Sequence, residues 1–108
     1  MNKKFVKVIL VGIAKRIFIN LDLVLLRALK RKIELLKQDP EYGIHIPKNL
    51  IPKKYLIDYD VTNLWKVNLP NGWRFIYSLK GSEHEILVLI LEIFNHKTYE
   101  KRFKYKTR

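Results

Sequence analysis

The alternation of apolar and polar residues over the first 40 positions predicts a strand followed by two helices. The apolar run over residues 5–11 forms the strand, and Gly12 breaks it. The apolar spacing over residues 13–20 fits a short helix. A longer helix follows over residues 22–38, where apolar side chains recur at alternating steps of three and four residues: Leu26, Leu29, Ile33 and Leu36.

Polar residues mark both ends of this longer helix. Asp22 offers a side-chain N-cap, and Asp39-Pro40 ends the helix because proline disfavours a helical conformation in the residue before it. Residues 41–62 contain Gly43, Pro47 and Pro52 and show no clear periodicity. We expect this segment to be an irregular connector that wraps the edge of a sheet.

The second half of the chain predicts three consecutive strands. Pro70-Asn71-Gly72 is a turn signal between runs rich in aromatic and β-branched residues, so residues 64–69 and 73–79 form a hairpin. After a second turn, residues 85–94 form a strand that is apolar on both faces and is therefore central in the sheet. The predicted order is strand, helix, helix, strand, strand, strand, in one domain spanning residues 1–108.

Two charged residues interrupt the apolar strands. Arg74 shares a strand face with Ile76, and a guanidinium held there cannot lose its charge and needs a carboxylate or a phosphate as its acceptor. Glu92 shares a face with Val88, Ile90 and Phe94. We interpret Glu92 as a structural partner for Arg74, in a salt bridge within the sheet.

The charge balance points to an anionic partner. The chain has 22 Lys and Arg against 10 Asp and Glu, a formal net charge of +12. Such an excess favours nucleic acid first and an acidic protein second, with solubility as the alternative explanation. Near the C-terminus the basic residues are interleaved with Tyr99, Phe103 and Tyr105, whose rings could stack on bases, and this favours nucleic acid.

Composition also excludes several classes of site. The sequence has no cysteine, which excludes disulfides, thiolate catalysis and cysteine zinc sites, and its three histidines show no metal-ligand spacing. We therefore expect no metal and no small-molecule cofactor. The apolar runs over 8–14 and 86–91 are too short for a signal peptide and a membrane span respectively. A soluble, cytoplasmic protein is expected.

These elements, together with several short segments, resemble the RelE/ParE superfamily of toxins from toxin–antitoxin systems. The segments that carry the resemblance are residues 35–40, 46–52, 63–65, 72–77 and 96–99. The resemblance implies an α+β fold of order β-α-α-β-β-β, with the two N-terminal helices on one face of a curved, mostly antiparallel sheet and a basic concave surface on the other. RelE-like members cleave mRNA in the ribosomal A site, whereas ParE-like members act on DNA gyrase, so the fold alone does not settle the activity.

The resemblance also implies a metal-independent endoribonuclease site made by Arg74, His96 and Tyr99. RNA cleavage by the ribose 2′-OH requires stabilisation of the charged phosphorane, which suits the fork of Arg74. It also requires proton transfer near neutral pH, which suits a histidine such as His96. Tyr99 would lie on the same side as His96 if the chain turns helically there, either to stack on a base, to help in proton transfer, or simply to pack against the core.

Basic residues around this site are expected to bind RNA. Lys66 lies on the strand opposite Arg74, and Lys97, Lys101 and Arg102 follow His96 as clamps on the RNA backbone. The sequence departs from many relatives at Lys97, where arginine is frequent, and at Asn95, where glycine is frequent. The expected partners are a cognate antitoxin, mRNA and the ribosome. The alternative is a gyrase-directed toxin or a binding relative without catalysis.

Overall fold

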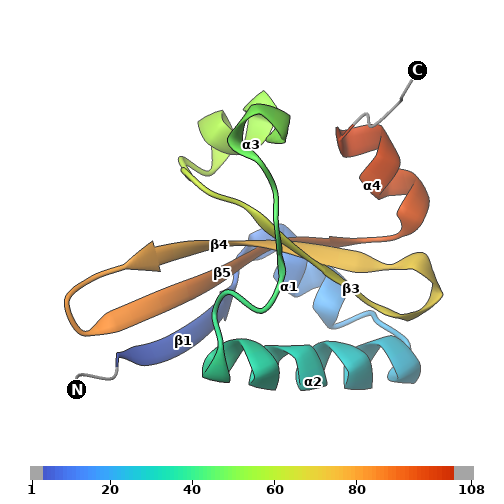
Figure 1. Ribbon diagram of the computed structural model, residues 1–108. Coiled ribbons are helices and arrows are strands. Elements are labelled where there is room, and N and C mark those ends of the chain that lie inside the picture. The colour runs from blue at the N-terminus through green and yellow to red at the C-terminus, as the bar shows by residue number, and fades with distance from the viewer. Residues whose placement is uncertain (1–3, 104–108) are drawn as a thin grey trace.

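A five-stranded sheet lies between two layers of helices in the computed structural model, which describes residues 4–103 (Figure 1). The strands follow the order β1-β5-β4-β3-β2, with β1 parallel to β5 and the other neighbouring pairs antiparallel. Their bounds are Phe5–Leu10 for β1, Ile44–His45 for β2, Trp65–Asn68 for β3, Arg74–Gly81 for β4 and Glu85–Phe94 for β5. The mostly antiparallel sheet and the internal position of β5 are confirmed.

Two N-terminal helices cover one face of the sheet, as predicted. These are α1, Gly12–Phe18, and α2, Leu23–Gln38. The predicted cap is confirmed, because the Asp22 carboxylate accepts a hydrogen bond of 2.9 Å from the backbone N–H of Leu25. Both helices pack on strand side chains in a first hydrophobic core, whose buried helical members are Ala14, Leu25, Ala28, Leu29 and Leu36.

The prediction of an irregular connector over residues 41–62 is wrong in part. This segment contains β2, a 3-10 turn η1 at Lys48–Leu50, and the helix α3 at Lys53–Asp58. Pro47 and Pro52, which suggested irregular structure, occupy the N-cap positions of η1 and α3. Proline at the start of a helix gives up no helical hydrogen bond, so the two prolines begin these elements and do not interrupt them.

The opposite face of the sheet is covered in part by a second layer that the predicted element order lacked. The helix α4, His96–Phe103, lies beside α3 on this face, away from α1 and α2 (Figure 1). Its Phe103 ring stacks on Tyr55 of α3 at 5.8 Å and on Tyr99 at 4.6 Å. The expected β-α-α-β-β-β order therefore omitted β2, α3 and α4, and a second hydrophobic core fills part of the face expected to be an open concave surface.

The predicted salt bridge between Glu92 and Arg74 is wrong. The pairing of β4 with β5 shifts between Ile76, opposite Glu92, and Tyr77, opposite Ile90, which leaves Leu91 as the extra residue. The bulge turns Glu92 toward the second core, on the same face as Ile76 and Arg74, but the carboxylate makes no ion pair with Arg74. It instead accepts hydrogen bonds from Tyr55 Oη and from Arg102, whose Nη2 lies 2.6 Å from Oε2. This buried group joins β5 to both α3 and α4.

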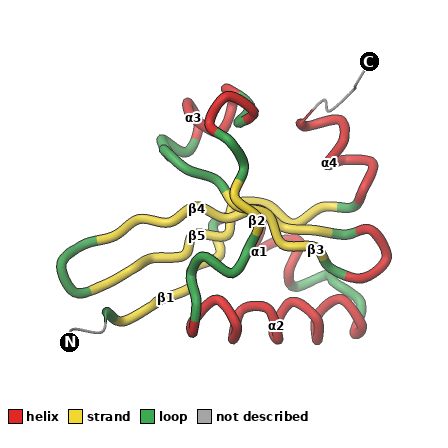
Figure 2. Tube along the Cα trace, in the orientation of Figure 1, coloured by secondary structure: helices red, strands yellow, loops and turns green. Residues whose placement is uncertain are grey.

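Tyr77 of β4 holds the segment that leads from the end of α2 to the sheet (green in Figure 2). Its buried hydroxyl donates to the carbonyl of Pro40 at 2.8 Å and accepts from the backbone N–H of Gly43 at 2.9 Å. A Cβ on Gly43 would lie 2.8 Å from this ring and 2.9 Å from the carbonyl oxygen of Lys66. Gly43 is therefore required by close approach, and burial raises the pKa of Tyr77 to about 12.

This raised pKa predicts a loss of stability in alkaline solution. An unfolded tyrosine titrates near pH 10, so the folded state keeps the proton of Tyr77 longer, and the stability that the neutral hydroxyl contributes disappears as pH rises from about 10 to about 12. Tyr77→Phe should lower the free energy of unfolding by about 1–3 kcal/mol at neutral pH, because it leaves two backbone groups unpaired. The variant should also lose less stability than the native protein as pH rises from about 10 to about 12. Urea unfolding at several pH values measures both effects. The exposed Tyr42→Phe is the control, and an unchanged alkaline slope in Tyr77→Phe contradicts the assignment.

Candidate active site

Two cations from neighbouring strands meet over one aromatic ring. Lys66 of β3 and Arg74 of β4 lie on the same face of the hairpin, because the register pairs Lys66 with Ile76 and Asn68 with Arg74. The Nζ of Lys66 is 5.3 Å from the ring centroid of Tyr99, and the guanidinium carbon of Arg74 is 4.4 Å from it. We call Lys66, Arg74, His96 and Tyr99 the cationic cluster.

No carboxylate neutralises these two cations among residues 4–103. Neither Lys66 nor Arg74 takes part in an ion pair with a described residue, and Arg74 Nε is buried without a hydrogen-bond partner in that part of the chain. Burial lowers the pKa of Lys66, and the charge of Arg74 lowers it further. The Tyr99 ring face offsets only part of this repulsion. An anion placed between the two cations would relieve it, which makes the cluster a candidate phosphate site.

His96 begins α4 and reaches Arg74 through its ring. The side chain of Asn95 accepts a hydrogen bond of 2.9 Å from the backbone N–H of Thr98, so Asn95 fixes the first turn of the helix. His96 Nδ1 is 2.9 Å from Arg74 Nη2. Because a guanidinium only donates, Nδ1 must accept, and this assigns the ring proton to Nε2. Nε2 lies 2.9 Å from a carboxylate oxygen of Glu100, and its N–H donates a hydrogen bond to that oxygen.

The turn between β3 and β4 brings the hairpin close to this histidine. Asn71 and Gly72 both have positive φ, 59° and 77°, in agreement with the turn signal in the sequence. A Cβ on Gly72 would lie 3.3 Å from the Cβ of His96, and the Gly72 carbonyl is 3.4 Å from Arg74 Nη2. The compact turn thus allows α4 to begin next to the guanidinium.

Within the cluster, the Tyr99 ring lies beneath the two cations. The residue is only 2% exposed, and its ring packs against Phe94 at 5.6 Å and Phe103 at 4.6 Å. Arg74 and Lys66 cover the other side of the ring. This arrangement matches the packing alternative that the sequence left open for Tyr99, and it gives the ring an indirect role in orienting Arg74.

The remaining predicted RNA-binding residues are spread around α4 by the turn of the helix. Lys97 and Lys101 are exposed on the side of α4 away from the buried Tyr99. Arg102 is bound to Glu92, and the hydrogen bond from this carboxylate raises the pKa of Arg102. Of the four predicted RNA-binding residues, Lys66 is the one that lies in the cationic cluster. Tyr105, considered above as a stacking residue, lies outside the described residues.

Glu100 is the site residue that the sequence reasoning missed. A signal for it existed, because Asn95 is a good N-cap and Tyr99 and Phe103 are spaced as one helical face. Once residues 96–103 form a helix, Glu100 must lie one turn from His96. The predicted helical turn joins only His96 to Tyr99 and does not extend to Glu100.

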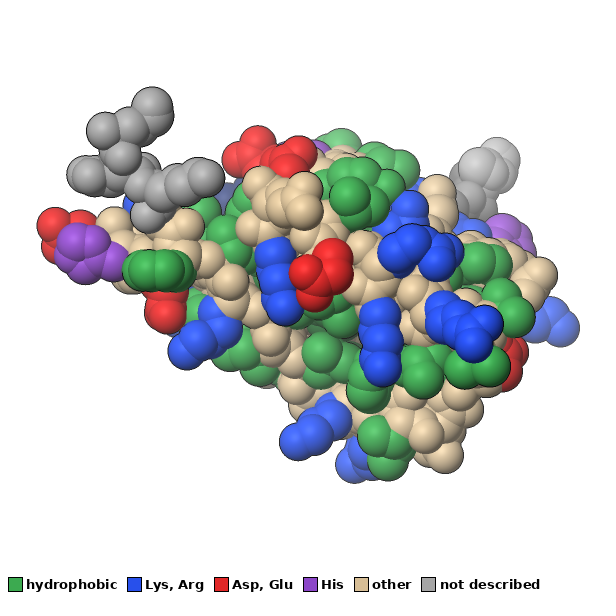
Figure 3. Space-filling view, turned by 90° about the horizontal axis from the view of Figure 1, so that it is seen from below, with side chains coloured by type: hydrophobic (Ala, Val, Ile, Leu, Met, Phe, Trp, Pro, Cys, Tyr) green, Lys and Arg blue, Asp and Glu red, His purple; other side chains and the backbone are tan. Residues whose placement is uncertain are grey.

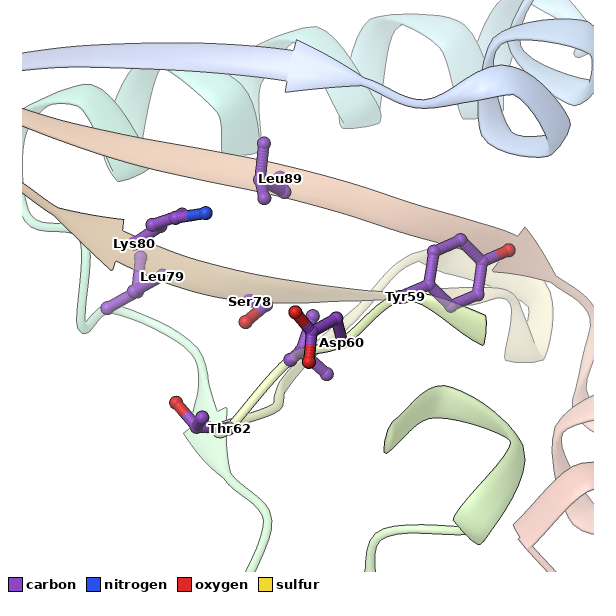
Figure 4. Close-up of a pocket in the computed structure, with 8 residues that line it drawn as sticks. Tyr59, Asp60, Thr62, Ser78, Leu79, Lys80 and Leu89 are labelled. Atoms are coloured by element: carbon purple, nitrogen blue, oxygen red, sulfur yellow. The ribbon is translucent and has the colours of Figure 1, made fainter. Parts of the chain in front are cut away.

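A separate cleft lies on the same side of the sheet, away from the cluster. Tyr59, Asp60 and Thr62 form one wall, and Ser78 and Lys80 of β4 form another (Figure 4). None of the predicted site residues lines this cleft. Within residues 4–103, no three metal-ligating side chains come together, and no helix has the length and apolar character needed to cross a bilayer.

Comparison with known proteins shows what the chain resembles as a whole. No protein-family model matches the sequence, and no curated protein matches it either. Among solved structures, a match is found to a double arginine-to-alanine variant of the E. coli toxin RelE in the free state, with a TM-score of 0.59 and 13% sequence identity. The alignment covers 96% of this chain and 98% of that one. At this identity the likeness is one of fold, and the chain has a RelE-like fold over nearly its whole length.

Proposed function

We propose that this protein is the toxin of a toxin–antitoxin pair and acts as a metal-independent endoribonuclease on mRNA in the ribosomal A site. The observation that carries the proposal is the cationic cluster, in which Lys66 and Arg74 share one ring face without a described carboxylate partner while His96 lies against Arg74. The likeness to the fold of the E. coli toxin RelE adds support. Cleavage of RNA by its own 2′-OH requires charge stabilisation, a base and an acid, and two cations beside an imidazole can provide these.

Each step of the proposed RNA cleavage is assigned to one residue of the cluster. Arg74 binds two phosphate oxygens and stabilises the phosphorane, because its fork matches their geometry. His96 accepts the proton of the 2′-OH as that oxygen bonds to phosphorus. The bond from phosphorus to the 5′-oxygen breaks, and the ammonium of Lys66, whose pKa burial has lowered, gives the leaving oxygen its proton. The products are a 2′,3′-cyclic phosphate and a 5′-hydroxyl.

An acidic antitoxin segment is proposed as the protein partner. Lys and Arg side chains spread across the face that carries α2, with apolar side chains between them (Figure 3). On α2 itself, Leu23 and Val24 are exposed at 57% and 59%, near the exposed Arg27. A partly disordered, acidic chain that folds as it binds would cover both kinds of surface. Co-expression with the neighbouring open reading frame should yield a stable complex if that frame encodes the antitoxin.

Expression in a bacterial host tests the toxin proposal directly. Induction should arrest growth, and the neighbouring frame should relieve the arrest. Purified protein should cleave mRNA bound to ribosomes, with 2′,3′-cyclic phosphate ends. Growth arrest together with inhibition of DNA gyrase and intact mRNA would instead support the ParE-like alternative. A harmless protein that neither cleaves RNA nor affects gyrase would overturn the proposal.

RNA affinity should depend steeply on salt if the basic residues contact phosphates. Each neutralised phosphate on a single strand contributes a slope of roughly −0.7 to the logarithmic salt dependence. Lys66→Ala should therefore reduce the slope by about that amount, and Lys97→Ala and Lys101→Ala should do the same if these residues clamp the backbone. Fluorescence anisotropy of a labelled oligonucleotide at several salt concentrations measures this. An RNA affinity that does not change with salt concentration would contradict these phosphate contacts and favour solubility as the explanation of the net charge.

A further inference from the structure

Glu100 is an acidic residue at the edge of the cationic cluster. Its carboxylate is 2.9 Å from His96 Nε2, and both side chains are exposed, at 59% for Glu100 and 57% for His96. An exposed ion pair one helical turn apart contributes little to the stability of the fold, so stability does not explain why Glu100 lies beside His96. A negative charge at this position also opposes the binding of phosphate. The carboxylate is better explained by what it does to the imidazole.

We propose that Glu100 is a positioning residue that holds His96 in the tautomer whose Nδ1 lone pair is directed at Arg74. This inference rests on the proposed function and assigns a new residue to that site. The Nε2–H of His96 donates a hydrogen bond to the Glu100 carboxylate, and Arg74 donates one to Nδ1. The ring is thereby fixed from both sides, with its basic nitrogen on the side of the two cations.

The arrangement also makes the base available only when substrate arrives. Without substrate, Arg74 Nη2 occupies the lone pair of His96 Nδ1 at 2.9 Å. A phosphate is a stronger acceptor for a guanidinium than a neutral imidazole, so a bound phosphodiester draws the Arg74 donors to itself. Nδ1 is then released beside the phosphate and accepts the 2′-OH proton. The charge of Glu100 stabilises the imidazolium that forms, as a carboxylate does for the histidine of a catalytic triad.

Steady-state kinetics separates this role from that of an ordinary surface acid. Glu100→Ala should lower kcat about 10- to 100-fold, a loss typical of a group that orients a histidine, while KM stays constant or falls. Glu100→Asp should recover part of the loss. A surface acid that merely repels RNA predicts the opposite, a lower KM with kcat unchanged, and that result would overturn the proposal. The control is Glu83→Ala, which removes an exposed acid 3.7 Å from His84 and outside the cluster.

Two further measurements sharpen the test, and the second is independent of the proposed function. In a double-mutant cycle on kcat, Glu100→Ala should cause no further loss of cleavage rate in a protein that already carries His96→Gln, because the carboxylate acts through the His96 ring. Nitrogen-15 NMR of the histidine rings should show His96 with a protonated, hydrogen-bonded Nε2 in the native protein and loss of that protected proton in Glu100→Ala. Identical His96 signals in both proteins would refute the positioning role. If the native protein cleaves no RNA yet the NMR change occurs, only the proposed function fails.

Discussion

Replacing Arg74 with alanine is expected to lower the rate of mRNA cleavage by about 10²- to 10³-fold, the usual cost of removing a preorganised charge from a developing oxyanion. The loss should appear in kcat as well as in KM, because the guanidinium binds the phosphate in the transition state and in the ground state. Single-turnover cleavage of ribosome-bound mRNA measures the chemical step. Relief of growth arrest in the host is the cellular readout.

Two controls make this result specific to the position of the charge. Arg74→Lys keeps the charge but loses the planar fork, so it should recover only part of the activity. Lys80→Ala removes a cation from the exposed far end of the same strand and should leave cleavage unchanged. Full activity in folded Arg74→Ala would place the site elsewhere and favour a toxin that acts by binding.

Glu92→Ala should destabilise the protein by about 3 kcal/mol. Breaking a buried ion pair typically costs about 3–5 kcal/mol, because the partner charge is left without compensation. The lower value applies here because the Arg102 side chain is 33% exposed and water can reach it, whereas that of Glu92 is only 4% exposed. The substitution also leaves Tyr55 Oη without its acceptor. Chemical denaturation at neutral pH, followed by circular dichroism, measures the change.

A comparison of three variants separates charge from packing in this buried group. Glu92→Leu combined with Arg102→Met removes both charges and should recover most of the stability lost in Glu92→Ala. Glu34→Ala breaks the exposed pair with Lys37 and should change stability by less than about 0.5 kcal/mol. Equal effects of Glu34→Ala and Glu92→Ala would contradict the structural importance assigned to Glu92.

The parts of the fold that sequence predicted well are those with strong local signals. The Asp22 cap and the Pro70-Asn71-Gly72 turn each have a side chain or a backbone conformation that few residues provide. The helix α3 was missed because it is only six residues long and its stability depends on the burial of Tyr55 by distant segments. Tertiary contacts of this kind leave no periodic pattern in a short segment.

The partner of Glu92 was unpredictable for a related reason. The strand β5 is apolar on both faces, so no alternation of polar residues reports where a bulge inserts an extra residue. The shift at Leu91 places Glu92 on the face of Arg74, but Arg102 of the unpredicted helix α4 binds the carboxylate there. Arg74 and His96, which the sequence assigns to one site, do lie together, because the two residues are next to the ends of neighbouring strands. The basic residues that follow His96 point in different directions, and not all toward the cluster, because they lie on the helix α4.

The pairing of the first strand with the last one makes the order of folding unusual. β1 pairs in parallel with β5, so Phe5 meets Glu85 across 80 residues of sequence, and the internal edge of β1 has no partner until β5 exists. Contacts this distant in the chain carry a large loop-closure entropy and slow folding. During synthesis the sheet therefore closes last, and α4 follows immediately after β5. If the protein is the proposed toxin, a ribosome must synthesise both β5 and α4 before the product can act on any ribosome.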